Sequence, residues 1–518
     1  MVISIRTTDN STTHFENEFS TKPIDIFLRL FKKLPEFWSA KIGVKKIIES
    51  FPIYKEYLQI PNSDEIYSWI EEICQTPHRR PGTPEGLKAE EWVFQKLKEL
   101  GVKNVTKEPI PIDVWNAEEW SLNVKGKIIP SFFCVNTGFT SAQGITAPLV
   151  YVGKGRYKDF KKVDVSGKIV VGEVTFPFIP IGILFNFLKI LRGVYHISDP
   201  DGSFSLFKTQ YLNFVRQNFI GGTTSENAPH NDVYWNSFKG GAKAICLILK
   251  NQPSNSNSHY GPYDGIMKPI PGLWIGKYDG IQLKKYAKLN FKATLNLTGS
   301  IKKGKMHNIW GVLPGQSEEN IMITSHHDAP FKGAVEDGSG VAQVLAQAKL
   351  WAGVNQKKRK RNMVFVVDAG HFYGSLGAHS FARTHSDLMN KTRLLITLEH
   401  LGAKEVREEN KHYIKTNKQA YTVMFTSPEP QVIATVINAL KRKPTKITTS
   451  MAMNLLADAP TSDAAGYALE SDVPLISWIG CPYYLLDEHD TLDKIDKKEI
   501  GRICETVTEM IKPYMARR

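Results

Sequence analysis

The chain has few cysteines for its length of 518 residues, and it contains no Cys-x-x-Cys pair. Its five cysteines are scattered and odd in number, which is not the pattern of a disulfide framework. We therefore expect reduced thiols in a cytoplasmic protein. The first residues also lack the basic-then-apolar pattern of a signal peptide. No segment offers an unbroken apolar stretch of about 20 residues, so the sequence predicts no membrane-spanning helix.

The charge of the chain is unbalanced. Its 66 lysines and arginines outnumber its 52 aspartates and glutamates, for a net charge of +14. A basic chain raises the question of nucleic-acid binding. The lysines are spread along the sequence, however, and the basic run at residues 357–361 lies between an expected helix and an expected strand. Cations suit a solvated helix end, so we expect no nucleic-acid partner.

The most informative segment, NIMITSHHDAPFKGAVEDGSG, spans residues 320–340. An apolar run ends in His326 and Asp328, and a short loop leads from there to Glu336 and Asp337. Imidazole and carboxylate groups at the end of a strand are the ligands that a divalent metal site requires. Asp328 lies on the same side of an extended chain as His326, where it can orient the imidazole.

Further segments carry a resemblance to a known family. The chain resembles the zinc exopeptidases that include bacterial leucyl aminopeptidases and glutamate carboxypeptidase. Members share a strand that ends in His-x-Asp, followed by an acidic residue shortly before Ser-Gly, here Glu336. The other matching motifs follow in order: Gly374-Ser375-Leu376-Gly377, Glu399-His400-Leu401-Gly402, Thr461-Ser462-Asp463 and Asp490-Thr491-Leu492-Asp493. Their order and spacing hold over roughly residues 60 to 515.

The resemblance implies an α/β fold, with a mixed, mostly parallel sheet sandwiched by helices. We place this catalytic-like domain in residues 61–117 and 301–518, after an N-terminal helical extension in residues 1–60. Residues 118–300 interrupt it and resemble the β-rich protease-associated insert of some members. Strands that alternate with helices toward the C-terminus support the same fold. In such sheets the site lies beyond the carboxyl ends of the strands, where distant residues can converge.

The resemblance also implies a ligand set. His326 and Glu399 stand at ligand positions of the family. Glu336 stands in place of the bridging aspartate, with Asp337 beside it as a second candidate. We expect these four residues to hold zinc by resemblance, although a carboxylate-rich site could accept another divalent ion.

At three places the chain departs from the family pattern. A paired general base and ligand, both glutamates in the family, are replaced by His371 and Phe372, and the last ligand histidine by Leu486. Phenylalanine cannot ligate a metal, so the two-zinc site of the family cannot form unchanged. We expect His371 to act as base or ligand, because a neutral imidazole can take a proton near pH 7. His489 is the candidate replacement ligand, and His400 is a further polar residue beside the substituted places.

These observations favour a metal-dependent hydrolase of peptide or small amide bonds, in which His371 and Asp328 assist catalysis. An alternative is an inactive peptidase fold kept for binding, as in the family's transferrin-receptor relatives. A third is a single-zinc acyl-transfer or cyclising activity, as in its glutaminyl cyclase relatives.

Residues 176–191, FPFIPIGILFNFLKIL, form an apolar segment within the expected insert. The segment is too short and too interrupted by proline to span a bilayer. An exposed apolar patch of this size needs a covering surface, so we expect an interface between subunits and hence a homo-oligomer. A flap over an apolar substrate is the second interpretation, and membrane contact is the least favoured.

Overall fold

The structure is a computed structural model that describes residues 32–33, 35–40, 42–176, 178–211, 232–262, 264–455, 459–460 and 462–516. Parts of the expected N-terminal extension and insert, together with Thr461 of one motif, lie outside these residues. No helix in the described ranges is long and apolar enough to cross a membrane.

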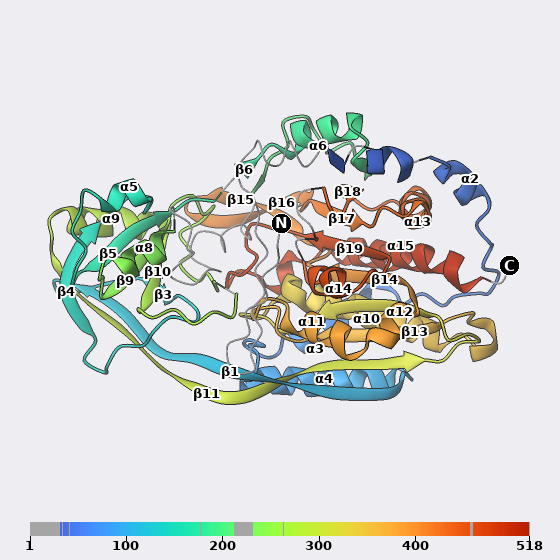
Figure 1. Cartoon of the computed structure of the whole chain (residues 1–518), viewed down its shortest axis with the longest axis horizontal. Helices are drawn as coiled ribbons and strands as arrows, with labels where there is room; N and C mark the ends of the chain where they lie inside the picture. The colour runs from blue at the N-terminus through green and yellow to red at the C-terminus, as the bar shows by residue number, and fades with distance from the viewer. Residues whose placement is uncertain are drawn as a thin grey trace.

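Two long strands link two regions of the molecule (Figure 1). Strand β1 (Lys103–Val124) pairs antiparallel with β11 (Lys292–Leu313) along almost its whole length. One end of β11 pairs with β4 (Ile145–Tyr151) of the insert and the other with β13 (Asn362–Asp368) of the α/β domain. The two sheets are therefore continuous through this ribbon.

The α/β domain has the mixed, mostly parallel sheet that the sequence predicts. From β11 its order is β13, β12, β14, β19, β17, β18 and β7. The bounds are β12 (Asn320–His326), β14 (Thr392–Glu399), β19 (Leu475–Gly480), β17 (Thr422–Thr426), β18 (Thr448–Ala452) and β7 (Val194–Ser198). Strands β13, β12, β14 and β19 run parallel, and β12 is buried along its whole length. Burial on both faces is typical of parallel sheets and explains the continuous apolar run before His326.

Helices cover both faces of this sheet. Ile321 and Ile323 of β12 pack into the core below α3 (Ser63–Ile73), α4 (Pro84–Glu99), α10 (Gly340–Ala352) and α15 (Lys497–Met515). Met322 points to the other core, with α11 (Leu376–Thr384), α12 (Ser386–Asn390) and α14 (Ala464–Glu470). This alternation follows from the two-residue period of a strand. Helix α4 begins where Thr83 accepts a hydrogen bond from the backbone of Gly86, with proline in the first turn.

The insert is a second sheet with its own apolar core, on the left in Figure 1. Its order is β3, β10, β9, β5 and β4, with β2 at the end of β1. The bounds are β2 (Lys127–Ile129), β3 (Ser131–Phe133), β5 (Ile169–Val174), β9 (Ala244–Leu249) and β10 (Gly272–Ile275), with helices α5 (Tyr157–Phe160), α8 (Val233–Lys239) and α9 (Lys277–Lys288). A separate antiparallel hairpin of β15 (Lys404–Glu409) and β16 (His412–Gln419) follows β14 in the α/β part of the chain.

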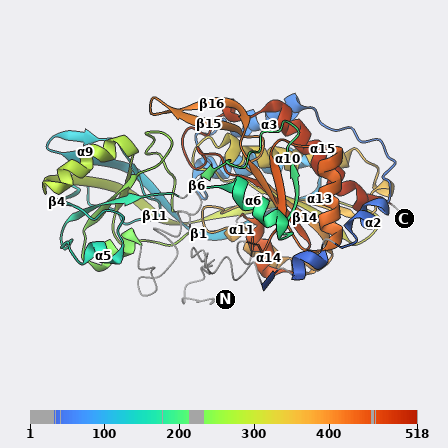
Figure 2. The same cartoon turned by 90° about the horizontal axis from the view of Figure 1, so that it is seen from above.

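One part of the expected insert returns to the α/β domain. We call it the arm: β6 (Phe178–Ile179), α6 (Ile181–Ile190), β7 and β8 (Gln210–Tyr211). Strand β7 pairs antiparallel with β18, and helix α6 lies over this domain (Figure 2). Phe185 and Leu188 of α6 are buried in a core shared with α2 (Val44–Glu49) and α13 (Pro430–Arg442). One face of the apolar segment is therefore covered by its own chain.

Candidate metal centre

Three histidines and one glutamate converge at the carboxyl edge of the α/β sheet. His326 is the last residue of β12, Glu336 lies in the turn Ala334–Ser339, His371 follows β13 and His400 follows β14. All four side chains are buried, and each offers a ligand atom within 4.8 Å of the others. We call these four residues the metal group. Parallel strands bring their ends to one edge, which explains why residues so distant in sequence meet.

Four distances within the metal group are close to those between the ligands of one tetrahedral ion. Nε2 of His326 lies 3.4 Å from Nε2 of His400. The nearest carboxylate oxygens of Glu336 lie 3.7, 3.5 and 3.3 Å from Nε2 of His326, His371 and His400 respectively. Zinc bonds of about 2.0–2.1 Å in a tetrahedron place neighbouring ligand atoms about 3.3–3.4 Å apart. Small adjustments of the side chains would therefore bring all four donors onto one ion.

The imidazole rings are oriented for this role. Each turns Nε2 into the metal group and Nδ1 toward an acceptor outside it. The Nδ1 atoms of His326, His371 and His400 lie 3.1 Å from the Asp328 carbonyl, 2.7 Å from the Asp463 carboxylate and 3.1 Å from the Gly480 carbonyl respectively. Metal-bound histidines commonly donate their second N–H to a carboxylate or carbonyl in this way.

The surroundings of Glu336 test whether the metal group suits a divalent ion. Its side chain is 1% exposed, and neither carboxylate oxygen accepts a hydrogen bond from the described residues. A buried carboxylate needs a cation beside it, and here that cation is either the protonated imidazoles at 3.3–3.7 Å or an ion that replaces their protons. Three inward-facing imidazoles and this carboxylate are a donor set that zinc accepts. The residues of the metal group therefore fit a divalent ion.

Charge within the metal group is balanced by protons when no ion is bound. Burial raises the pKa of Glu336, but the neighbouring histidines, His400 first, outweigh it and lower the pKa to about 2. Burial lowers the pKa of His371, but the Asp463 carboxylate outweighs it and raises the pKa to about 9. A divalent ion would take the place of protons on these imidazoles.

A second group of ligand atoms adjoins the first and shares His371. It consists of His371, Glu399 and Asp463, all buried. Burial, reinforced by the charge of Asp463, raises the pKa of Glu399 to about 7. Burial acts in the same direction on Asp463, but His371 outweighs it and holds the pKa of Asp463 below its usual range. Because the Nδ1 atom of His371 already faces Asp463, this group is better described as support for His371 than as a second metal site.

The predicted site residues divide into two sets. His326, Glu336 and His371 lie in the metal group, and Glu399 lies in the adjoining group. Asp328 contacts His326, with Oδ1 3.5 Å from its Nδ1. Asp337 comes within 3.8 Å of His326 Nε2, but its carboxylate is occupied by hydrogen bonds, among them one from the backbone N–H of His400.

The structure places His489 away from both groups. Its Nδ1 lies 2.6 Å from the Asp487 carboxylate, and its ring packs edge-on against Tyr413. In its place the group contains His400, for which the sequence offered one signal: it directly follows the ligand position Glu399. A left-handed backbone conformation, with φ of 58°, accompanies the position of this side chain.

Apolar side chains occupy the substituted ligand positions. Phe372 and Leu486 are buried members of the insert's core. The ring of Phe372 packs edge-on against His371 on one side and against Tyr260 of the insert on the other. The backbone of Tyr260 donates a hydrogen bond to the Leu486 carbonyl. The insert thus contributes an apolar wall beside the metal group.

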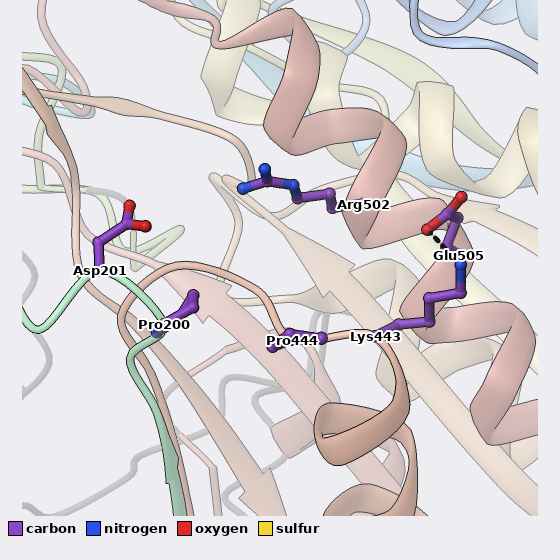
Figure 3. Close-up of a pocket in the computed structure, with 6 residues that line it drawn as sticks. All are labelled: Pro200, Asp201, Lys443, Pro444, Arg502 and Glu505. Carbon is purple, nitrogen blue, oxygen red and sulfur yellow. Dashed lines mark ion pairs between the residues drawn. The ribbon is translucent and has the colours of Figure 1, made fainter.

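Two surface hollows lie elsewhere. One, of about 210 Å³, is lined by Pro200, Asp201, Lys443, Pro444, Arg502 and Glu505 (Figure 3). In it Lys443 pairs with Glu505 at 3.0 Å. A larger one, of about 640 Å³, lies near α10 and the end of α4. Neither hollow is lined by a residue of the metal group.

The chain is similar to known proteins in sequence and in fold. Residues 308–511 match the model of Peptidase family M28. The resemblance to zinc exopeptidases is confirmed. The match contains all four residues of the metal group, whereas the insert and the N-terminal residues lie before it. No curated protein matches the chain.

Solved structures of similar fold cover nearly the whole chain. The zinc aminopeptidase BSAP from Bacillus subtilis is 18% identical with a TM-score of 0.63, over 89% of this chain and 97% of that chain. A Peptidase M28 precursor from Shewanella amazonensis SB2B is 17% identical with a TM-score of 0.61, over 93% and 97%. An aminopeptidase from Aneurinibacillus sp. strain AM-1 is 19% identical with a TM-score of 0.55, over 87% and 93%. At these identities the likeness establishes the α/β fold alone.

Proposed function

We propose that the protein is a metal-dependent hydrolase of peptide or amide bonds that holds one divalent ion, zinc by preference, in the metal group. The proposal rests on the surroundings of Glu336: its buried carboxylate accepts no hydrogen bond from the residues that the structure describes, and it lies 3.3–3.7 Å from three imidazole nitrogens. In this proposal His371 is a ligand rather than a base. The family match over residues 308–511 supports the reaction class.

A bound zinc ion would polarise a substrate carbonyl and lower the pKa of a water molecule. The residues of the chain supply the rest. Asp328 and Asp463 orient His326 and His371, which keeps their Nε2 atoms directed inward. Burial of these side chains excludes bulk water and strengthens each electrostatic contact. Binding and orientation are thus assigned to the carboxyl edge of the sheet.

Proton transfer is assigned to Glu399. Its oxygens accept only the backbone N–H of Asp463 among the described residues, at 3.2 and 3.4 Å, so lone pairs remain to receive a proton. The carboxylate lies in the group that shares His371 with the metal group. We assign it to take a proton at Oε from the attacking water and return it to the departing amine.

The test is a zinc titration of the purified, chelator-treated protein, followed by assays on peptides and aminoacyl amides. We expect one zinc per chain, with binding lost in Glu336→Gln and His400→Ala. His489→Ala is the matched control, because His489 belongs to neither group, and it should bind zinc like the original protein. Less than about a tenth of an equivalent with no rebinding would overturn the proposal.

A second candidate is a binding protein on an inactivated peptidase fold. Phe372 and Leu486, buried where the family resemblance expects ligands, favour it. This candidate predicts that the protein binds zinc without hydrolysing any peptide or amide. Hydrolysis that disappears in Glu399→Gln, with zinc binding retained, would decide against it.

A third candidate is acyl transfer on a single ion, which the one-ion geometry also suits. A peptide with N-terminal glutamine separates the two reactions, because cyclisation releases ammonia whereas hydrolysis of the first peptide bond releases glutamine.

We also propose a cytoplasmic location. All five cysteines are free, and four of them are buried, which supports reduced thiols.

A further inference from the structure

We infer that Arg79 is a positioning residue that holds Glu336 in the metal group, together with Asp490 from the opposite side. The inference rests on the proposed metal site, but it concerns residues that lie outside both groups of ligand atoms.

Arg79 is a buried cation whose partners are backbone carbonyls. Its side chain is 0% exposed. Its guanidinium donates to the carbonyls of His327, Lys332, Gly333 and Glu336 at 2.7, 2.5, 2.9 and 3.2 Å. Its backbone exchanges two hydrogen bonds with Ala329. A planar group with five donors in a fixed fork is suited to gather several carbonyls at once. Arg79 therefore defines the path of the loop between His326 and Glu336.

Asp490 holds the same loop from the other side. Its two carboxylate oxygens accept the backbone N–H groups of Val335 and Glu336 at 2.9 and 2.8 Å. Both backbone polar groups of Glu336 are therefore bound by buried side chains, the N–H by Asp490 and the carbonyl by Arg79.

The loop between His326 and Glu336 is closely packed at Gly333. Gly333 has φ of 56°, and a Cβ atom there would lie 2.0 Å from the Glu336 carbonyl oxygen and 2.9 Å from the Arg79 guanidinium. Only glycine fits this position without displacing the loop.

The backbone matters because the carboxylate of Glu336 receives no hydrogen bond from the described residues. Its position among the three imidazoles therefore depends on the backbone that carries it, and that backbone is held by Arg79 and Asp490. A lysine at position 79 would place a single ammonium with three donors where four carbonyls are now bound, so it cannot hold the whole loop. Loss of this support should loosen the carboxylate and weaken metal binding.

Arg359 provides a matched control. It is also buried, at 5% exposure, and it also donates to carbonyls, including those of Pro314, Trp351 and Val354. Its loop lies between α10 and β13 and contains no residue of the metal group. Arg79→Lys and Arg359→Lys therefore remove the same kind of support, in one case at Glu336 and in the other at a loop that contains no residue of the metal group.

The experiment measures zinc affinity of the full-length protein by competition with a chromophoric chelator, alongside thermal unfolding of the zinc-free protein. We expect both variants to unfold at lower temperature. We expect only Arg79→Lys to weaken zinc affinity, by about 10- to 100-fold, as is typical for residues that orient ligands. Equal affinity of Arg79→Lys and the original protein, or an equal loss in Arg359→Lys, would overturn the inference.

Asp490→Asn supplies a second variant should Arg79→Lys fail to fold. An amide retains one acceptor oxygen and cannot accept both N–H groups. We expect weaker zinc binding with an unchanged far-ultraviolet circular dichroism spectrum, and unchanged affinity would contradict the inference. If the original protein binds no zinc at all, the proposed function fails as well, whereas zinc binding that is indifferent to Arg79 and Asp490 contradicts the inference alone.

Discussion

The insert and the α/β domain both bury charged groups, but they treat them differently. In the insert, Lys268 is fully buried and bonds both carboxylate oxygens of Asp264 within its own loop. Asp232 is buried too, and one of its oxygens caps the first turn of α8. In the α/β domain, Glu336 has no such local partner and instead faces three histidines from other segments. The buried charge of Lys268 is neutralised within its own loop and supports the fold, whereas Glu336 meets imidazoles from three other segments, which can exchange their protons for an ion.

The largest expected effect concerns the ion pair of the insert. Lys268→Met leaves the Asp264 carboxylate without its buried cation, so we expect a loss of roughly 3–5 kcal/mol in the free energy of unfolding. Urea unfolding measures this. Zinc affinity should stay unchanged, and a large loss of zinc binding in this variant would contradict the distinction between the two regions.

Bound zinc should stabilise the α/β domain against unfolding. A ligand that binds only the folded protein stabilises it by about 2.7 kcal/mol when present at 100 times its dissociation constant. We expect zinc to raise the unfolding temperature of the original protein and to leave that of Glu336→Gln unchanged. Differential scanning calorimetry with and without zinc measures both, and an equal response of the two proteins would contradict the role of Glu336.

Asp232 predicts a dependence on pH. Burial raises its pKa to about 8, so the folded state retains this proton up to higher pH than the unfolded state does. The free energy of unfolding should then fall as pH rises from about 4 to about 8. Asp232→Asn keeps the capping oxygen and removes the titration, so it should lose less stability than the original protein between pH 5 and pH 8.5. Urea unfolding at pH 5 and 8.5 measures this, and identical slopes would contradict it.

The smallest effect on stability is expected at the outer face of α6. Ile183, Phe187 and Ile190 remain 50%, 42% and 76% exposed although the opposite face is buried. The expected homo-oligomer therefore has only this face of the helix available. We predict that replacing the three residues by serine reduces the mass measured by light scattering. Serine at the exposed Ile128, Ile281 and Leu289 of the insert is the control. An unchanged mass would contradict the oligomer.

The sequence predicted the fold and part of the metal group, for identifiable reasons. Strand ends with polar residues are local patterns, and they singled out His326, Glu336 and His371, which the structure brings together. The place of His400 depends on a backbone conformation that no local pattern specifies. His489 was expected from its nearness in sequence to Leu486, but its ring pairs with Asp487 instead.

The position of the arm on the α/β domain could not be predicted from local sequence patterns either. Its apolar composition predicted that it needs cover, and the structure supplies that cover for one face through α13 and α2. The pairing of β7 with β18 joins segments from distant parts of the chain, and alternation within either strand does not specify its partner.

The ribbon of β1 and β11 has a mechanical consequence. A domain tethered by a flexible linker can swing toward its neighbour, but here the same two strands are shared by both sheets. The insert is therefore joined to the α/β domain by continuous strands rather than by a linker, and its apolar core extends to Phe372 and Leu486 of that domain.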